Sequence, residues 1–526
     1  MKTVVVIGAG VSGLECARAL VYDNVDIHVI ILEAENSVGG RICTMTGFFT
    51  NEKRPLEMGA EFLHGNETIL LDVAASRVEP LRQITPWSQG DGGPSTTPAP
   101  DGGIGYYALR GDKEGEYRVL SAPETFEDPE VSKVHDALWD LGDLSDEEAK
   151  FPPPPTTAPS PGPSLATYLE ERVGKVAGKK ARDFGCSGFA NTCGGNADTM
   201  PMPMAAMFER CYERDGEDAD FRADGSIGKG GEDVYRGRQC ELRLKHRVTR
   251  IEYDDVDDDG NKVVRVVGDG WEVKCDAVVC TIPVPPLRSI TFSPPLPPQK
   301  QGAISDLHMA DAVKVILGFS KRCWPADAHG CIIAGDEAEQ IKDGRIEFPE
   351  IWFNAAEGIG EATSFPPSSR LHSSTYPVQP STPSQPPLSQ VHWEGEKARY
   401  SATFFAMHHR AEHVRDHLDP SSVIQQAKEQ LEQMFGMGAT KYCVSSMVHV
   451  WSREHPNVGG GYTGPSASEI VMGSKQRQFL AQPIANRIFF AGEATAGAYD
   501  DRDAPATIHG AMLTGRRAAS EVAVSL

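Results

Sequence analysis

The amino-acid sequence predicts an α/β protein in which a doubly wound domain with a β-meander is combined with a second, α+β domain built on a mixed sheet. Three observations carry this prediction: a glycine-rich turn after an apolar run at the N-terminus, a series of short β-type runs in the middle, and an apolar run followed by a helical pattern at the C-terminus. The chain has 526 residues, which is too long for one ordinary core, so two domains with insertions fit its length.

The first element is a buried strand that leads into a turn of the form G-x-G-x-x-G. Residues 4–7 are apolar, and the turn contains Gly8, Gly10 and Gly13. Gly8 permits a tight turn, Gly10 lets the backbone approach a pyrophosphate, and Gly13 lets the next helix pack closely on the strand. The helix would direct its free amide groups and its positive dipole end at the phosphates.

A second apolar run, residues 29–32, ends at Glu33. An acid at this distance from the glycine turn is placed to accept hydrogen bonds from ribose hydroxyls and to repel a 2'-phosphate. Strand, turn, helix, strand and acid therefore occur in the order of a Rossmann-like, dinucleotide-binding unit.

The middle of the chain predicts an antiparallel meander. Short β-type runs cover residues 247–253, 263–267 and 271–273, and a buried strand at 277–282 is stopped by Pro283. Beyond it, residues 420–435 have helical periodicity, and Ser421 and Ser422 are the expected N-terminal caps.

Near the C-terminus, a last apolar strand at 487–491 precedes a helix from about 505 to 522. Three segments rich in Pro, Ser, Thr and Gly interrupt the pattern at 89–105, 151–163 and 364–387. They predict disordered insertions at the surface, either passive spacers or proline-rich docking segments.

Charge and cysteine content exclude several classes of protein. The balance of 51 basic and 74 acidic residues, 51 − 74 = −23, opposes binding to nucleic acid or anionic membranes, and the acidic run 254–259 predicts a hairpin tip. The 11 cysteines form no C-x-x-C pair, so neither a disulfide framework nor a zinc site is indicated. With no secretory signal or apolar span, we expect a cytoplasmic protein, and peroxisomal import stays open.

Gly39, Gly40 and Arg41 follow Glu33 closely, and they could close over a pyrophosphate held by the first turn. With these residues the chain resembles the flavin-dependent amine oxidases, the family of polyamine oxidases, monoamine oxidases and lysine-specific histone demethylases. The resemblance extends over nearly the whole chain. Its further carriers are residues 59–65, Lys314, Trp451, Gly461, Tyr462, residues 490–495 and residues 506–510.

The resemblance implies FAD as the cofactor. It is expected to be noncovalent, because Gly461 stands where monoamine oxidases carry the cysteine that tethers their flavin. The cofactor-binding residues that it implies are Gly8, Gly10, Ser12, Gly13, Glu33, Gly40, Arg41, Gly59, Ala60, Glu61, Val248, Trp451, Gly492, Glu493, Thr507 and Ile508. For Glu493 an ordinary helix-capping role is the alternative.

Lys314 is a lone cation in the otherwise apolar run 312–319. Either this strand lies at an edge and the lysine reaches water, or its amine faces a polar cleft. The resemblance implies that it holds a water near the flavin N5 atom. Tyr462 and Thr507 would form the two walls of the substrate site, with the tyrosine ring facing the amine. His64 would line the substrate tunnel, or be an ordinary core histidine.

The same resemblance divides the chain between the two domains. The expected FAD-binding parts are residues 1–75, 225–290 and 463–526, and the expected substrate-domain parts are residues 76–224 and 291–462.

We therefore expect a polyamine oxidase type of amine oxidase, which transfers a hydride from an amine to the flavin and releases an aldehyde and hydrogen peroxide. Its partners would be a small amine and dioxygen, with no nucleic acid and no membrane, and its oligomeric state stays open. An L-amino-acid oxidase would need an arginine for the substrate carboxylate, such as Arg210 or Arg214. A histone demethylase, a carotenoid-type desaturase and a flavin-binding scaffold without turnover are further alternatives.

Two other groups of residues invite a functional interpretation. The acidic loop 500–503 could bind a second cationic nitrogen or could simply be solvated. His409, His413 and His417 would share one helical face, either as an exposed face or as metal ligands.

Overall fold

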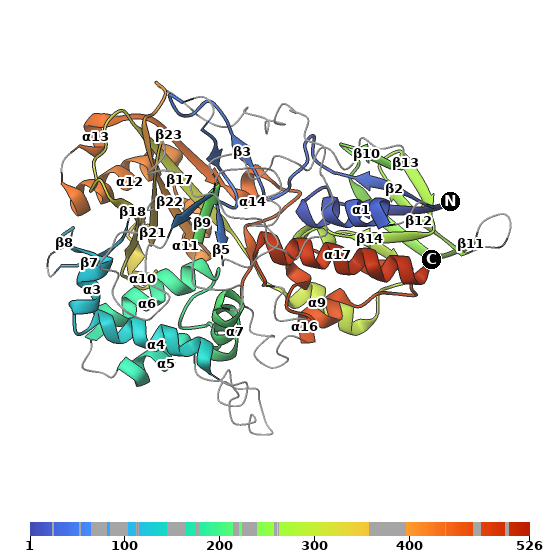
Figure 1. The fold of residues 1–526 in the computed structure, drawn as a ribbon, viewed down its shortest axis with the longest axis horizontal. Coiled ribbons are helices and arrows are strands. Elements are labelled where there is room, and N and C mark those ends of the chain that lie inside the picture. Colours follow the sequence, from blue (N-terminus) through green and yellow to red (C-terminus); the bar gives the residue numbers. More distant parts are fainter. Residues whose placement is uncertain are drawn as a thin grey trace.

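The computed structural model has two lobes, and both termini lie in the same lobe (Figure 1). It describes the chain apart from residues 24–25, 52–53, 65–80, 85–103, 112, 114, 145–163, 174–177, 214–219, 224–238, 257–259, 261, 357–395, 437, 466–474 and 500–503. The predicted insertions 151–163 and 364–387 lie outside the described residues. The third, 89–105, lies outside them up to residue 103, and its last two residues begin a strand.

A parallel sheet is the centre of the lobe that contains the termini. Its strands, in spatial order, are β10 (Cys240–Arg243), β2 (Ile27–Leu32), β1 (Lys2–Ile7), β14 (Ala277–Cys280) and β25 (Ile488–Phe490). The strands come from distant parts of the chain, so the sheet closes only when residues near both ends and the middle meet. The runs predicted as buried strands at 4–7, 29–32, 277–282 and 487–491 are confirmed in this sheet.

Two helices cover one face of this sheet. Helices α1 (Val11–Asp23) and α17 (Ile508–Ser525) lie side by side. Their apolar residues form one core with the side chains on the face of β1 and β2 that the helices cover. Thr507 caps α17, so this helix begins two to three residues later than the sequence predicts and runs on to residue 525.

The predicted meander covers the other face. Its strands are β13 (Trp271–Cys275), β12 (Lys262–Gly268), β11 (Val248–Val256) and β15 (Thr291–Ser293). They share a second core with the parallel sheet and with α9 (Pro298–Asp306) and α16 (Lys475–Ala481). Because β15 pairs with β11 and α9 packs here, the chain stays in this lobe beyond residue 290, where the sequence placed a domain boundary. Residues 257–259 of the expected hairpin tip lie outside the described part.

The second lobe is built on a mixed sheet, as predicted. The strands in order are β23 (Cys443–Val450), β17 (Ala312–Phe319), β22 (Tyr400–Met407), β21 (Glu350–Ala355), β18 (Ala328–Ile333), β7 (Ile104–Arg110) and β8 (Tyr117–Ser121). Only the β7–β18 pair is parallel among the described neighbours. Strand β17 lies between β22 and β23, so the edge-strand alternative for Lys314 is wrong.

Helices surround the mixed sheet. On one side lie α11 (His409–His417) and α12 (Pro420–Phe435). Further helices of this lobe are α3 (Ala122–Glu127), α4 (Val131–Asp143), α5 (Leu165–Val173), α6 (Gly178–Thr192), α7 (Met202–Glu213), α10 (Glu337–Gln340) and α13 (Ala439–Tyr442). The predicted bounds of α12 are confirmed, but its cap is Asp419, whose carboxylate accepts the Ser422 amide; Ser421 and Ser422 lie inside the helix.

Short elements complete the described structure. They are β3 (Thr44–Met45) with β4 (Leu56–Glu57), β16 (Met309–Ala310) with β24 (Tyr462–Thr463), β19 (Ile341–Lys342) with β20 (Arg345–Ile346), the strands β5 (Phe62–His64), β9 (Asp220–Ala223) and β6 (Leu81–Ile84), and helices α8 (Val284–Leu287) and α14 (Trp451–Glu454). Within the described ranges, no helix combines the length and the apolar character needed to cross a membrane.

Candidate active site

The glycine-rich turn has the geometry that its spacing predicts. Gly8 has φ +104°, which favours glycine, and a Cβ on Gly13 would lie 2.0 Å from the Gly8 carbonyl oxygen. Gly13 is therefore required for α1 to pack on β1. A Cβ on Gly10, in contrast, would meet no described atom within 4 Å, so this glycine borders open space at the start of α1.

The open space beside Gly10 has polar surroundings. Ser12 is 4% exposed, and its hydroxyl has no hydrogen-bond partner among the described residues. Gly39 donates its amide to Ala9, and a Cβ on Gly40 would lie 3.4 Å from the Gly10 Cα, so the second glycine pair closes against the first turn. A hydroxyl without a partner beside free amides suits the phosphates of a dinucleotide, so the residues present fit such a cofactor.

Glu33 ends β2 beside this turn. Its carboxylate accepts hydrogen bonds from the amides of Ala9, at 2.7 Å, and Glu35, at 2.8 Å. Burial raises the pKa of Glu33, and these two backbone donors partly offset the effect. The carboxylate is thus held in a fixed orientation with further acceptor capacity.

Arg41 joins the N-terminal and C-terminal parts of the site. Its guanidinium donates to the Gly461 carbonyl, at 3.0 Å, and to the Glu493 carboxylate, at 2.6 Å. Burial disfavours the charged form of Glu493, but the charge and hydrogen bond of Arg41, with a bond from the Thr463 hydroxyl, hold its pKa below the usual value. The helix-capping interpretation of Glu493 is therefore insufficient, because this carboxylate is the centre of an ionic network.

Sequence reasoning missed one member of this network, Arg477. This arginine is fully buried in α16, and it donates to Thr463 Oγ1 and to the carbonyls of Glu493 and Ala494. It fixes the turn that begins at Gly492, whose φ is +115°. A single arginine in a helix that is mostly polar in sequence offers no signal of this role.

Lys314 lies at the junction of the two lobes, but it does not stand alone as the sequence suggested. Its ammonium donates to the carbonyls of Glu57, at 3.0 Å, and Gly59, at 2.9 Å, and it forms an ion pair with Glu61 at 3.1 Å. Both side chains of the pair are less than a tenth exposed. The alternative in which the amine faces polar groups is therefore supported, and these groups include a carboxylate.

Residues 59–61 are shaped to meet the lysine and a tryptophan. A Cβ on Gly59 would lie 1.9 Å from the Arg41 carbonyl oxygen and 3.1 Å from the Trp451 ring, and the Ala60 amide donates to the same carbonyl. Trp451 is 4% exposed and stacks on His455, with ring centroids 4.6 Å apart. The predicted residues Arg41, Gly59, Ala60, Glu61, Lys314 and Trp451 therefore form one cluster.

His449 is a second residue that sequence reasoning missed. It is the direct cross-strand neighbour of Lys314 in the β17–β23 pair, so both side chains lie on the same face of the sheet. Its ring packs edge-on against Trp451 at 5.1 Å. Burial, together with the nearby His455 and Lys314, lowers the pKa of His449 to about 3.

Tyr462 and Thr507 are held in place by different elements. The Tyr462 hydroxyl donates to the Thr192 carbonyl, which orients the ring from the end of α6. Thr507 caps α17: its hydroxyl donates to the Ala504 carbonyl and accepts from the Gly510 amide, at 2.8 Å and 3.0 Å. Ile508 is the first residue of α17, whose N-terminal end points toward the other lobe (Figure 1).

The remaining predicted residues are only partly defined. Val248 is buried at the start of β11, and Gly492 precedes the short turn Glu493–Thr495. His64 ends β5, where its backbone pairs with Asp220, and nothing is described of its side chain. The Arg210 side chain, Arg214 and the acidic loop 500–503 lie outside the described part.

Cysteines and histidines complete the predicted set. The cysteines whose side chains the structure describes are free thiols. His409 and His417 are exposed on α11, whereas His413 is partly buried, so the three do not form a uniformly exposed face. His409 instead approaches His408 and Glu337.

Comparison with known proteins agrees with this geometry. The chain is 28% identical to Probable polyamine oxidase 4 of Arabidopsis thaliana over 348 residues, covering 61% of this chain and 59% of that protein. It is 25% identical to Polyamine oxidase 2 of Arabidopsis thaliana, covering 99% of this chain and 89% of that protein. In Lysine-specific histone demethylase 1 of Caenorhabditis elegans the match covers only 31% of the length.

The fold also matches a solved structure, wild-type putrescine oxidase bound to putrescine, with a TM-score of 0.65 at 16% identity over 99% of both chains. At this identity the likeness shows the fold alone. The family of flavin containing amine oxidoreductases matches residues 11–105 and 232–523, well over half of the sequence. This chain belongs to the family of flavin containing amine oxidoreductases.

Proposed function

We propose that this protein is an FAD-dependent amine oxidase of the polyamine oxidase type, which converts an amine to an aldehyde with release of hydrogen peroxide. The observation that carries the proposal is the buried Lys314–Glu61 pair, held by the Gly59 carbonyl beside Trp451 and Arg41. Burying an ion pair costs more free energy than packing apolar side chains in the same place. This cost supports a chemical use for the cation at this position.

Residues from the N-terminal and C-terminal parts of the chain would hold the cofactor. Gly10 and Ser12 would take the phosphates, Glu33 the ribose hydroxyls, and Arg41 with Glu493 would close the site. When bound, the flavin would supply the two-electron chemistry, accepting a hydride from the carbon beside the amine nitrogen and passing the electrons to dioxygen.

The noncovalent mode follows from the space around Gly461. A Cβ there would lie 2.8 Å from the Ala312 Cβ and 3.2 Å from the Met407 Cε. A larger residue at this position would require its neighbours to shift, and glycine itself has no thiol, which supports a flavin bound without a tether here.

The chain's own residues would prepare the amine and the water. The Tyr462 ring, oriented by its bond to Thr192, would face the amine nitrogen in a poorly hydrated site, where the neutral amine is favoured. The three N–H groups of Lys314 are donated to Glu57, Gly59 and Glu61, so one of these bonds would be exchanged for a water molecule when the ammonium orients it for proton transfer. The N-terminal end of α17 would stabilise negative charge in front of it.

A peroxide assay tests the proposal. Purified, flavin-loaded protein is supplied with spermine, spermidine, putrescine, an acetylated polyamine, an aromatic monoamine and L-glutamate in air, and hydrogen peroxide is measured. The proposal expects peroxide with polyamines, at rates well above those with the monoamine and the amino acid. Peroxide from the amino acid alone would reject it in favour of an L-amino-acid oxidase, and no peroxide from any compound would indicate a scaffold.

A further inference from the structure

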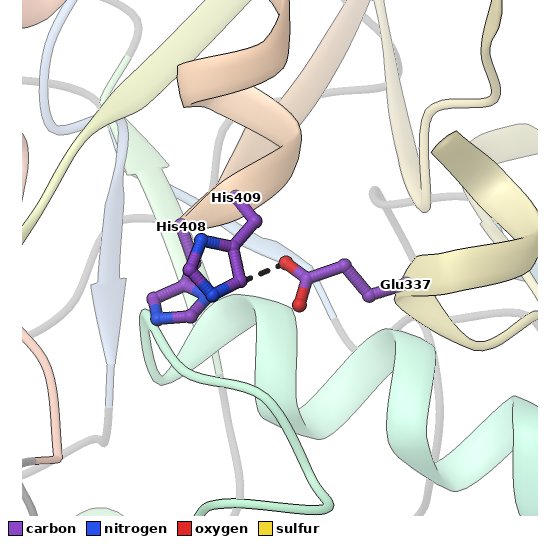
Figure 2. Close-up of side chains that lie close together, drawn as sticks. All are labelled: Glu337, His408 and His409. Atoms are coloured by element: carbon purple, nitrogen blue, oxygen red, sulfur yellow. Dashed lines mark hydrogen bonds and ion pairs between the residues drawn. The ribbon is translucent and has the colours of Figure 1, made fainter. Parts of the chain in front are cut away.

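A second group of functional side chains lies in the substrate lobe, at the start of α10 and α11. Glu337, His408 and His409 each offer one ligand atom, and these atoms all lie within 4.8 Å of one another (Figure 2). The Glu337 carboxylate is 3.3 Å from His408 Nδ1. Two imidazoles and a carboxylate are a donor set that transition metals use.

The backbone at His408 has a strained conformation that brings the two imidazoles together. His408 precedes α11 with φ +58° and ψ −135°, a conformation that residues other than glycine rarely adopt. With this bend, the rings of two consecutive residues lie 3.9 Å apart between centroids. Such strain costs on the order of 1–3 kcal/mol and is concentrated at functional positions.

Neighbouring side chains orient two of the three ligands. The Asn196 amide donates to the second oxygen of Glu337, and the Glu412 carboxylate lies 2.9 Å from His409 Nδ1. A carboxylate on Nδ1 fixes the histidine tautomer and leaves the other ring nitrogen free to bind a metal. The cluster therefore has the outer layer of hydrogen bonds that metal sites require.

The ligand types select the ion. Arg410, which is 2% exposed, lies 3.7 Å from the Glu337 carboxylate, and its charge opposes any cation there, so binding would depend on the two imidazoles. Imidazole ligands favour zinc over calcium or magnesium. The His409 side chain is 61% exposed, so water can complete the coordination.

We propose that Glu337, His408 and His409 form a zinc-binding site that links α10 to the start of α11. Zinc would replace the direct Glu337–His408 contact and hold together two helices that are far apart in the sequence. Because binding occurs only when all three groups are in place, zinc would stabilise the folded protein. The site contains none of the residues assigned to amine oxidation, so zinc binding can be tested independently of that activity.

Direct zinc binding tests the site. Untagged, flavin-loaded protein is stripped with a chelator, dialysed against zinc chloride at pH 7.5, and analysed for bound zinc and for its melting temperature. The wild type is expected to retain about one zinc ion per chain and to melt at a higher temperature with zinc. His409→Ala and Glu337→Gln should each weaken binding by at least about tenfold, whereas the control His417→Ala on the same helix should not.

One further variant sharpens the outcome. His408→Asn, which tolerates positive φ, should fold and yet lose zinc. The proposal is overturned if the wild type retains no more zinc than the Glu337→Gln/His409→Ala double variant, whatever its activity on amines.

Discussion

At the scale of single residues, the Lys314–Glu61 pair distinguishes this site from an ordinary core. Both groups are buried, and each satisfies the charge of the other across 253 positions of sequence. A buried ion pair adds little net stability compared with apolar packing, but removal of one partner leaves an uncompensated charge. Substitution of Lys314 alone, compared with substitution of both Lys314 and Glu61, therefore separates the effect on stability from the effect on catalysis.

Lys314→Met is expected to lower the free energy of unfolding by about 3 kcal/mol, because it leaves the Glu61 carboxylate buried without a cation. It should also slow flavin reduction or reoxidation about 100-fold. The Lys314→Met/Glu61→Gln double variant should recover most of the stability and none of the rate. Stopped-flow absorbance and urea unfolding measure the two effects, and full activity in the double variant would remove the lysine from the mechanism.

His449 makes a prediction about pH. Its pKa is about 3 in the folded protein and about 6.5 in an unfolded chain, so the folded state favours the neutral imidazole. This contribution to stability is fully present above pH 6.5 and is lost as the pH falls from 6.5 toward 3, by at most about 1.4 kcal/mol per pH unit. Between pH 7 and pH 5, urea unfolding should show that the wild type loses about 2 kcal/mol more stability than His449→Gln does. An unchanged pH dependence in the variant would contradict this assignment.

At the scale of elements, the glycine turn and α1 separate packing from cofactor binding. A Cβ on Gly13 collides with the Gly8 carbonyl, whereas a Cβ on Gly10 meets no described atom. Gly13→Ala is expected to destabilise the flavin-free protein by about 2 kcal/mol or more. Gly10→Ala should leave its stability within about 0.5 kcal/mol of the wild type and still reduce flavin binding at least about tenfold, since the new methyl group fills the space beside the phosphates.

Thermal unfolding of the flavin-free variants and titration with FAD give the two quantities. Equal flavin affinity of Gly10→Ala and the wild type would show that the cofactor does not approach this turn. A Gly13→Ala protein as stable as the wild type would instead contradict the packing of α1 on β1.

The elements also show what can be predicted from a sequence. The glycine turn, Glu33, the meander and α12 depend on local spacing, and the structure agrees with them. The partners of Lys314 could not be predicted, because Glu57, Gly59 and Glu61 belong to a distant segment that only the folded chain brings near. The same holds for His449, whose role depends on its pairing with β17. Thr507 was expected as a wall of the site, and only the structure shows that its hydroxyl is occupied in capping α17.

At the scale of the whole molecule, the net charge of −23 acts over a longer range than any single contact. Such a field attracts cations and raises their encounter rate, and salt screens it. A polyamine with several charges should therefore respond to salt more strongly than a monoamine.

We expect kcat/KM for spermine to fall at least about threefold as the ionic strength rises from about 0.01 M to about 1 M, where the Debye length shrinks from about 30 Å to about 3 Å. An aromatic monoamine, measured in parallel, should change by less than half as much on a logarithmic scale. Steady-state peroxide formation at both salt levels provides the comparison. Equal responses of the two substrates would mean that the overall charge serves solubility only.

The proposed flavin-binding turn follows β1 of the parallel sheet, whereas Lys314 lies in β17 of the mixed sheet in the other lobe. The most direct measurement of this account is the visible spectrum of the purified protein under anaerobic conditions while spermine, acetylated polyamines, aromatic amines and amino acids are added in turn. The account predicts a yellow protein whose flavin absorbance is bleached by polyamines and returns when air is admitted. A protein that stays colourless after incubation with FAD, or a bound flavin that none of these compounds bleaches, would contradict it.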